Sequence, residues 1–170
     1  MGLILYVTYV SFFIYELKKE NNYTPPTYLQ DMTFDKKNEV KLNDIGYKIE
    51  DMKKCKKVKT NNHTYIAQKK FMIITLRVAN YRNVDLTLKY NKFALTNNIS
   101  TVYPKTKISE ELNKAVSDNI NEKILTKIKA NNVKKIHLVF NLNKNIMQSK
   151  NMLLNVYSET NAQNKISIVL

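Results

Sequence analysis

The sequence is short of the residues that most often mark a functional site. Its 170 residues include one cysteine, two histidines, two glycines, three prolines and no tryptophan. A single cysteine, Cys55, excludes an intramolecular disulfide. The two histidines form no cluster with cysteine or carboxylate at the spacing of zinc ligands, and no glycine-rich loop could cradle a phosphate. We therefore expect no metal site, no cofactor and no enzymatic activity.

Arginine is also scarce, although the chain is strongly basic. Lys and Arg total 28 against 14 Asp and Glu, a formal net charge of +14, and only Arg77 and Arg82 are arginines. Because proteins that read nucleic acid usually rely on arginine for bidentate contacts, this composition disfavours nucleic acid as a partner without excluding it. A lysine surplus indicates a diffuse attraction to polyanions. An AT-rich genome, whose codons favour Lys, Asn, Ile and Tyr, would produce the same surplus.

The lysines are concentrated in residues 52–70, which contain no acidic residue. The lysines of this basic segment are Lys53, Lys54, Lys56, Lys57, Lys59, Lys69 and Lys70. Such a cluster would attract the headgroups of anionic lipids, teichoic-type polymers or nucleic acid. The alternative interpretation is a solvated hairpin loop that has no partner.

The beginning of the chain is apolar. Residues 3–15 carry no charge, and Lys18, Lys19 and Glu20 follow soon after. This run is shorter than the roughly 20 residues that span a bilayer, and its length is typical of a signal-peptide core, about 7 to 15 residues. No basic residue precedes it and no small-x-small cleavage site follows it, which favours a retained anchor; a buried core helix is the alternative. The expected anchor residues are Leu3, Ile4, Leu5, Val7, Val10, Phe12, Phe13 and Ile14.

The composition divides the chain into three segments. Residues 1–20 are the hydrophobic membrane anchor or signal segment, residues 21–42 are a polar spacer, and residues 43–170 form one domain. By the positive-inside rule, Lys18 and Lys19 alone would place the domain in the cytoplasm. A start further upstream, with basic residues of its own, would reverse this orientation. We expect a single N-terminal anchor in the cell membrane and an extracytoplasmic domain at the cell surface.

Segments that alternate between apolar and polar residues dominate the domain and predict β-strands. Residues 71–80 give the strongest pattern, and their first half is apolar on both faces. One face of that strand carries Met72, Ile74, Leu76 and Val78. The other expected strands are residues 45–49, 86–90, 93–95, 101–103, 125–128, 136–142, 152–156 and 166–170.

One segment has a helical period instead. Apolar residues recur at helical spacing within residues 109–125, and Ser109 followed by two glutamates resembles a helix start. The apolar residues are Leu112, Val116, Ile120 and Ile124. We expect Glu110, Glu111 and Asp118 to form the solvated face of this helix.

Asparagine takes the place of glycine at the expected turns. After glycine, it is the residue that best adopts left-handed backbone conformations. It is abundant around residues 80–83, 97–98, 131–132, 141–145 and 161–164. Seven or eight short strands separated by such turns predict a mainly β fold, an antiparallel β-sandwich with one short helix.

Several positions resemble the pattern of a known family. The matching features are the strand 71–78, Asn80, the Phe-x-Leu strand 93–95, Tyr103 and the pair Val139-Phe140. Over residues 43–170 this order resembles the Ig-like extracellular domain family of unknown function, found in Gram-positive lipoproteins and membrane-anchored surface proteins. The glycine-containing turns and the lipidated cysteine of that family are absent here. The resemblance implies an exported Ig-like β-sandwich of the cell envelope, without a known chemistry.

Together these features lead to one main hypothesis and two alternatives. The main hypothesis is a membrane-anchored, extracytoplasmic β-sandwich that acts as a non-enzymatic interaction module and binds another envelope protein or an anionic envelope polymer. The first alternative is a subunit of a membrane-spanning secretion or conjugation complex. The second is a polyanion or nucleic-acid binder that uses the basic segment.

Overall fold

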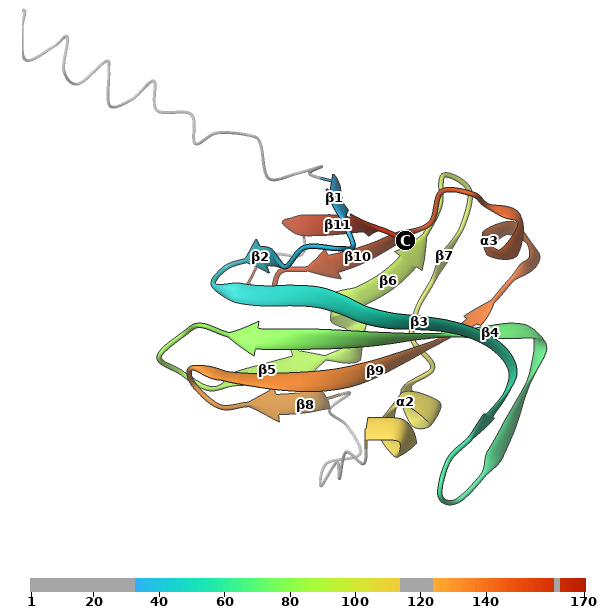
Figure 1. Cartoon of the computed structure of the whole chain (residues 1–170), viewed down its shortest axis with the longest axis horizontal. Helices are drawn as coiled ribbons and strands as arrows, with labels where there is room; N and C mark the ends of the chain where they lie inside the picture. The colour runs from blue at the N-terminus through green and yellow to red at the C-terminus, as the bar shows by residue number, and fades with distance from the viewer. Residues whose placement is uncertain (1–32, 114–123, 161–162) are drawn as a thin grey trace, which may run out of the picture.

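A computed structural model shows the arrangement of the chain (Figure 1) and describes residues 33–113, 124–160 and 163–170. The expected anchor, residues 1–20, and residues 21–32 of the expected spacer lie outside the described residues. Within the described ranges, no helix combines the length and the apolar character needed to cross a membrane.

Two sheets pack face to face and confirm the expected mainly β, sandwich-like fold. The first sheet contains, in spatial order, β1 (Thr33–Asp35), β11 (Lys165–Val169), β10 (Leu153–Tyr157), β6 (Phe93–Thr96) and β7 (Thr101–Val102). The second contains β2 (Val40–Leu42), β3 (Ile45–Lys59), β4 (Thr64–Asn80) and β9 (Asn132–Leu142). A separate pair consists of β5 (Leu86–Lys89) and β8 (Ile124–Ile128).

Each expected strand is found, and two are much longer than expected. β3 continues to Lys59 and β4 begins at Thr64, so the basic segment lies largely in strands. Residues 33–42, which the sequence analysis placed in the spacer, form β1 and β2.

The helices differ more from expectation. The expected helix over residues 109–125 is α2 (Thr106–Asn113), and Ile124, expected on its apolar face, belongs to β8; residues 114–123 lie outside the described residues. A second helix, α3 (Lys144–Gln148), and a 3-10 turn, η1 (Tyr90–Lys92), were not expected. A turn was expected where α3 lies. The Asn143 side chain accepts a hydrogen bond from the backbone N–H of Ile146 (2.9 Å), so this asparagine is a helix N-cap.

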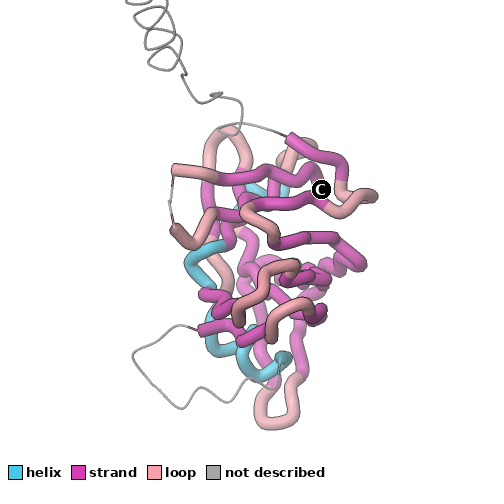
Figure 2. The backbone as a smooth tube through the Cα atoms, turned by 90° about the vertical axis from the view of Figure 1, so that its left-hand side faces the viewer, coloured by secondary structure: helices cyan, strands magenta, loops and turns pink. Residues whose placement is uncertain are grey.

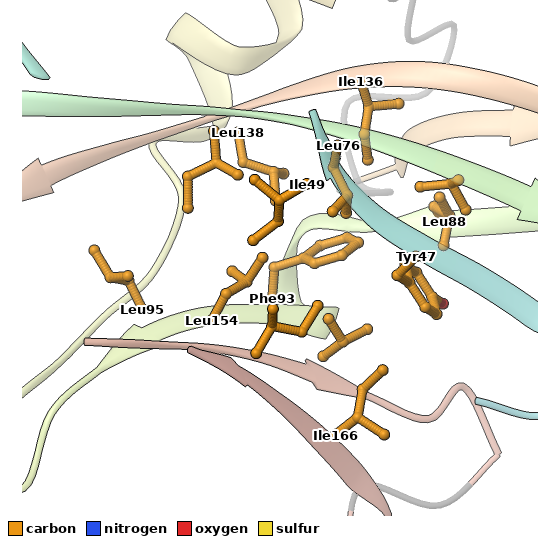
Figure 3. Packing of buried hydrophobic residues seen from close by; sticks show 14 of the residues in the cluster. Tyr47, Ile49, Leu76, Leu88, Phe93, Leu95, Ile136, Leu138, Leu154 and Ile166 are labelled. Atoms are coloured by element: carbon orange, nitrogen blue, oxygen red, sulfur yellow. The ribbon is translucent and has the colours of Figure 1, made fainter. Parts of the chain in front are cut away.

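The main core lies between the two large sheets (Figure 3). The predicted apolar face of β4 points into it, and its four side chains, Met72, Ile74, Leu76 and Val78, are all buried. From the facing sheet, Phe93 meets Tyr47 edge to face, with 6.3 Å between the ring centroids, the arrangement that aromatic pairs prefer.

The opposite face of β4 is covered as well. Phe71, Val58, Ala67 and Val139 form a second buried cluster with Ile108 of α2. β4 is therefore enclosed between the main core and a helix, which explains why its sequence is apolar on both faces.

Left-handed backbone occurs at one of the expected asparagine turns, residues 131–132, and at a turn that was not expected, residues 43–44. Asn43 and Asp44 have φ angles of 51° and 59° and form the two-residue turn between β2 and β3, and Asn131 has a φ of 52° before β9. Two left-handed residues in succession are the requirement of a type I′ hairpin turn. Gly46 serves another purpose: a Cβ there would lie 2.5 Å from Oε1 of Glu39.

Truncating the buried ring of Phe93 should destabilise the sandwich. The side chain has no exposed surface, so we expect Phe93→Ala to lower the free energy of unfolding by about 3–5 kcal/mol. Chemical denaturation measures this. The matched control is Ile99→Ala, because Ile99 is 80% exposed and its truncation should change stability by no more than about 0.5 kcal/mol. Equal effects of the two variants would contradict the described core.

Candidate functional site

The basic segment forms a two-stranded arm that extends past the rest of its sheet. We define the arm as residues 52–70: residues 52–55 still pair with residues 71–74 of β4 beside β9, and the rest of the arm extends beyond β9. β2 pairs with β3 only at residues 45–47, and β9 pairs with β4 only from Lys70 onward. Among the described strands, residues 57–59 pair with residues 64–66, and neither range pairs with a third strand. In Figure 1 the arm leaves the sandwich and bends towards α2, and Figure 2 also shows its tip beside that helix.

The strands of the arm form because one of their faces is apolar. Val58 pairs with Tyr65, and Cys55 pairs with Phe71. These four side chains lie in the second cluster or against it, together with Leu112 of α2. We call this side the inner face. A packed inner face lets the lysine-rich strands persist, although their sequence lacks a clear alternation.

α2, on which the arm rests, is itself fixed to the edge of β9 by side chains. The Ser109 hydroxyl accepts a hydrogen bond from the backbone N–H of Val139 (3.0 Å). The Asn113 amide accepts from the N–H of His137 (2.7 Å) and donates to its carbonyl oxygen (2.8 Å). These bonds satisfy backbone groups that a neighbouring strand would otherwise pair. His137 is partly buried there, beside Thr75.

A single carboxylate joins the tip of the arm to α2. Glu111 accepts hydrogen bonds from the hydroxyls of Thr60 and Tyr65, the latter at 2.6 Å, and its Oε1 lies 3.2 Å from Nδ1 of His63. We call these four residues the Glu111 cluster. The Glu111 side chain is only 15% exposed. The expectation that Glu111 lies on a solvated helix face is therefore wrong, and Asp118 lies outside the described residues.

The Glu111 cluster shifts the ionisation of its members in opposite directions. Hydrogen bonds from Thr60 and Tyr65 hold the pKa of the Glu111 carboxyl below its ordinary value. The hydrogen bond to Glu111 raises the pKa of the Tyr65 phenol to about 12, because a phenolate beside a carboxylate is unfavourable. At neutral pH the cluster is therefore an ionised glutamate with neutral hydroxyl donors.

The other side of the arm, its outer face, carries most of the charge. Residues directly opposite each other in an antiparallel pair share a face, and Lys54, Lys57 and Lys59 are opposite Met72, Ile66 and Thr64. Lys70 precedes Phe71 of the inner face and so also points outward. The outer face thus presents Lys54, Lys57, Lys59, Lys70 and the side chain of Ile66.

All seven lysines of the arm are exposed. Lys56 donates to the carbonyl oxygen of Gln68 (2.7 Å). The salt bridges among the described residues involve other side chains, such as Lys135 with Glu50, and none includes an arm lysine. The lysines that the sequence singled out are thus gathered on one projecting element, and Lys53 lies beside Ile73 on the inner-face side.

The described residues hold no group of three or more His, Cys, Asp or Glu side chains placed to bind a metal ion. The one carboxylate–histidine pair at the arm, Glu111 with His63, belongs to the contact that holds the tip. The exposed lysines of the arm can attract anions, and the packed inner face holds the strands that carry them.

No family model matches the chain. No curated protein matches it either. Solved structures resemble it in fold. An uncharacterised β-sandwich protein of Clostridium difficile matches with a TM-score of 0.51 and 10% identity, over 82% of this chain and 94% of the other. A secreted protein of Mycobacterium tuberculosis, MPT63, matches with a TM-score of 0.53 and 12% identity, over 82% and 95%.

A candidate lipoprotein of Bacillus subtilis is also similar, with a TM-score of 0.50 and 14% identity. It aligns over 78% of this chain and 38% of its own. At such low identities these similarities define the class of fold, a β-sandwich, and leave the function to be argued from the site.

Removing the charge of Glu111 should change the titration of Tyr65. In Glu111→Gln the pKa of Tyr65 should fall from about 12 towards the ordinary tyrosine value of 10.0, since a neutral amide no longer opposes the phenolate. NMR of ring-labelled tyrosine at alkaline pH measures this, and Tyr65→Phe identifies the signal. An unchanged pKa in the variant would show that the two side chains are not in contact.

Acid should release the tip of the arm. Because the folded-state pKa of Glu111 is lowered, its ionised form stabilises the docked tip above the unfolded-state pKa, and this contribution is lost as pH falls through the folded-state pKa. Backbone hydrogen exchange at the tip, corrected for intrinsic rates, should be constant from neutral pH to mild acid and rise below the ordinary glutamate range. Glu111→Gln should lack this transition; a transition of the same size there would assign it to another group.

Proposed function

We propose that the protein is a membrane-anchored, extracytoplasmic β-sandwich that acts as a non-enzymatic interaction module at the cell envelope and binds an anionic partner through the arm. The observation that carries this proposal is the projecting arm, whose seven lysines are exposed and whose residues include no acid. The arm is the place in the chain where positive charge is most concentrated.

The geometry of the arm supports a binding role. Its inner face is packed on α2, and the Glu111 cluster fixes its tip. The backbone that carries the lysines is thus ordered before any partner arrives, which lowers the entropic cost of binding. Lysine ammonium groups bind phosphate or carboxylate as point charges, so the partner needs a high density of negative charge and no particular geometry.

The proposed location rests on the beginning of the sequence and on the similar folds. Residues 3–15 are apolar, and Lys18 and Lys19 follow them. Among the similar structures, one protein is secreted and another is a candidate lipoprotein. These features favour an exported domain held by an N-terminal anchor.

Reversing charge on the arm should release the partner. The arm variant combines Lys54→Glu, Lys57→Glu and Lys59→Glu. The control variant combines Lys89→Glu, Lys127→Glu and Lys129→Glu and therefore has the same net charge. Its three lysines are exposed and lie in β5, in β8 and in the turn that follows β8. The full-length chain is purified from membranes in mild detergent, and co-purifying proteins and polymers are identified by mass spectrometry and phosphate analysis. We expect an anionic partner with the wild type and the control, and its loss from the arm variant.

Two outcomes would contradict the proposal. If all three chains retain the same partners, the arm is not the binding surface, and a defined set of membrane proteins held by all of them would favour the subunit of a larger complex. If external protease fails to remove a C-terminal epitope from intact cells, the domain is not extracytoplasmic.

A further inference from the structure

The outer face of the arm combines positive charge with one exposed apolar side chain. Ile66 is 64% exposed and lies directly opposite Lys57. The other large apolar side chains that are exposed among the described residues lie outside the arm: Tyr81, Val84, Ile99, Tyr103, Val133 and Val169. Ile66 belongs to neither of the two apolar clusters, so its burial against a partner would be favourable.

The combination restricts the chemistry of the partner. A soluble polyanion would engage Lys54, Lys57, Lys59 and Lys70 but would leave Ile66 in water. The surface of an anionic bilayer offers phosphate groups for the ammonium groups and, just beneath them, an apolar layer for an aliphatic side chain. Lysine is suited to this boundary because its long apolar stem can lie in the interface while its charge stays at the headgroups.

The orientation of the arm is compatible with such a surface. The inner face is occupied by α2 and the Glu111 cluster, so the outer face points away from the helix. Lys57, Lys59 and Ile66 lie beyond the end of β9, whereas Lys54 and Lys70 are exposed at the border of the main core, opposite Met72 and Leu142. The five side chains come from two neighbouring paired strands, which keeps them on one side of a continuous two-stranded ribbon.

We propose that the outer face of the arm docks on a bilayer that contains anionic phospholipids, with Lys54, Lys57, Lys59 and Lys70 at the headgroup phosphates and Ile66 in the interface. This inference rests on the proposed function, in which the arm is the binding surface, and names the partner as lipid. The expected N-terminal anchor would keep the domain close to such a surface.

The test measures whether the arm itself contacts the bilayer. Membrane binding by the whole chain would not show this, because the apolar N-terminal residues could bind lipid themselves. An environment-sensitive fluorophore is attached to Thr64→Cys, on the outer face, in a Cys55→Ser background. The full-length chain is reconstituted into vesicles of phosphatidylcholine alone or of equal parts phosphatidylcholine and phosphatidylglycerol. A label at Ile99→Cys, on the turn between β6 and β7, is the control site.

We expect the fluorophore at position 64 to move into an apolar environment, and to be quenched by brominated lipid tails, only in vesicles with phosphatidylglycerol. Adding Lys54→Glu, Lys57→Glu and Lys59→Glu should weaken this response at least about a hundredfold, since each lysine near an anionic surface contributes about fivefold. Ile66→Ser should weaken it about three- to tenfold. The control triple variant at Lys89, Lys127 and Lys129 should behave as the wild type.

Other outcomes separate this inference from the proposed function. A fluorophore that responds equally in both vesicles, or in neither, overturns lipid docking. If inorganic polyphosphate protects the labelled site while the bilayer does not, the partner is a soluble polyanion; the arm remains the binding surface and only the lipid inference fails. If the binding of lipid, of polyphosphate and of every co-purified partner is independent of the arm lysines, both proposals fail.

Discussion

The burial of β4 on both of its faces is the constraint on which the rest of the structure depends. One face closes the main core, and the other requires a cover that the second large sheet cannot provide. α2 provides that cover, and Ser109 and Asn113 hold it against β9. Because the helix is fixed there, Glu111 at its end reaches the hairpin that continues β3 and β4 beyond the sheet. The position of the basic arm is therefore a consequence of core packing.

Much of the fold could be predicted because a strand that is buried on one face has a sequence in which apolar and polar residues alternate. The β4 pattern is the clearest case, and Asn131, in one of the expected turns, has the left-handed φ expected of an asparagine that takes the place of glycine. The Glu111 cluster could not be predicted, since its partners are 46 to 51 positions away in sequence and a helical glutamate normally faces water. Asn143 was misassigned because a turn and a helix N-cap use the same side-chain hydrogen bond.

The lysines of the arm were identified from composition. Their arrangement depends on the pairing of β3 with β4, which composition does not predict. A strand that is polar at almost every position has no periodic signal; only the contacts of Val58 and Tyr65 with α2 separate an inner from an outer face. The similar folds do not supply this information, because they share the sandwich at 10–14% identity. The proposed function thus rests on the side chains of the arm and not on the shared fold.

A further strand would meet a different obstacle at each of the two unpaired sides of the four-stranded sheet. At β9, side chains of α2 occupy the backbone groups that another strand would need. β3 beyond Tyr47 has no second partner strand among the described residues, and its lysines repel a like copy. Protection by hydrogen bonding is insensitive to ions, whereas repulsion is screened by salt and cancelled by bound anions. An anion bound to the arm would therefore also reduce the repulsion between neighbouring molecules and allow them to approach each other more closely along β3.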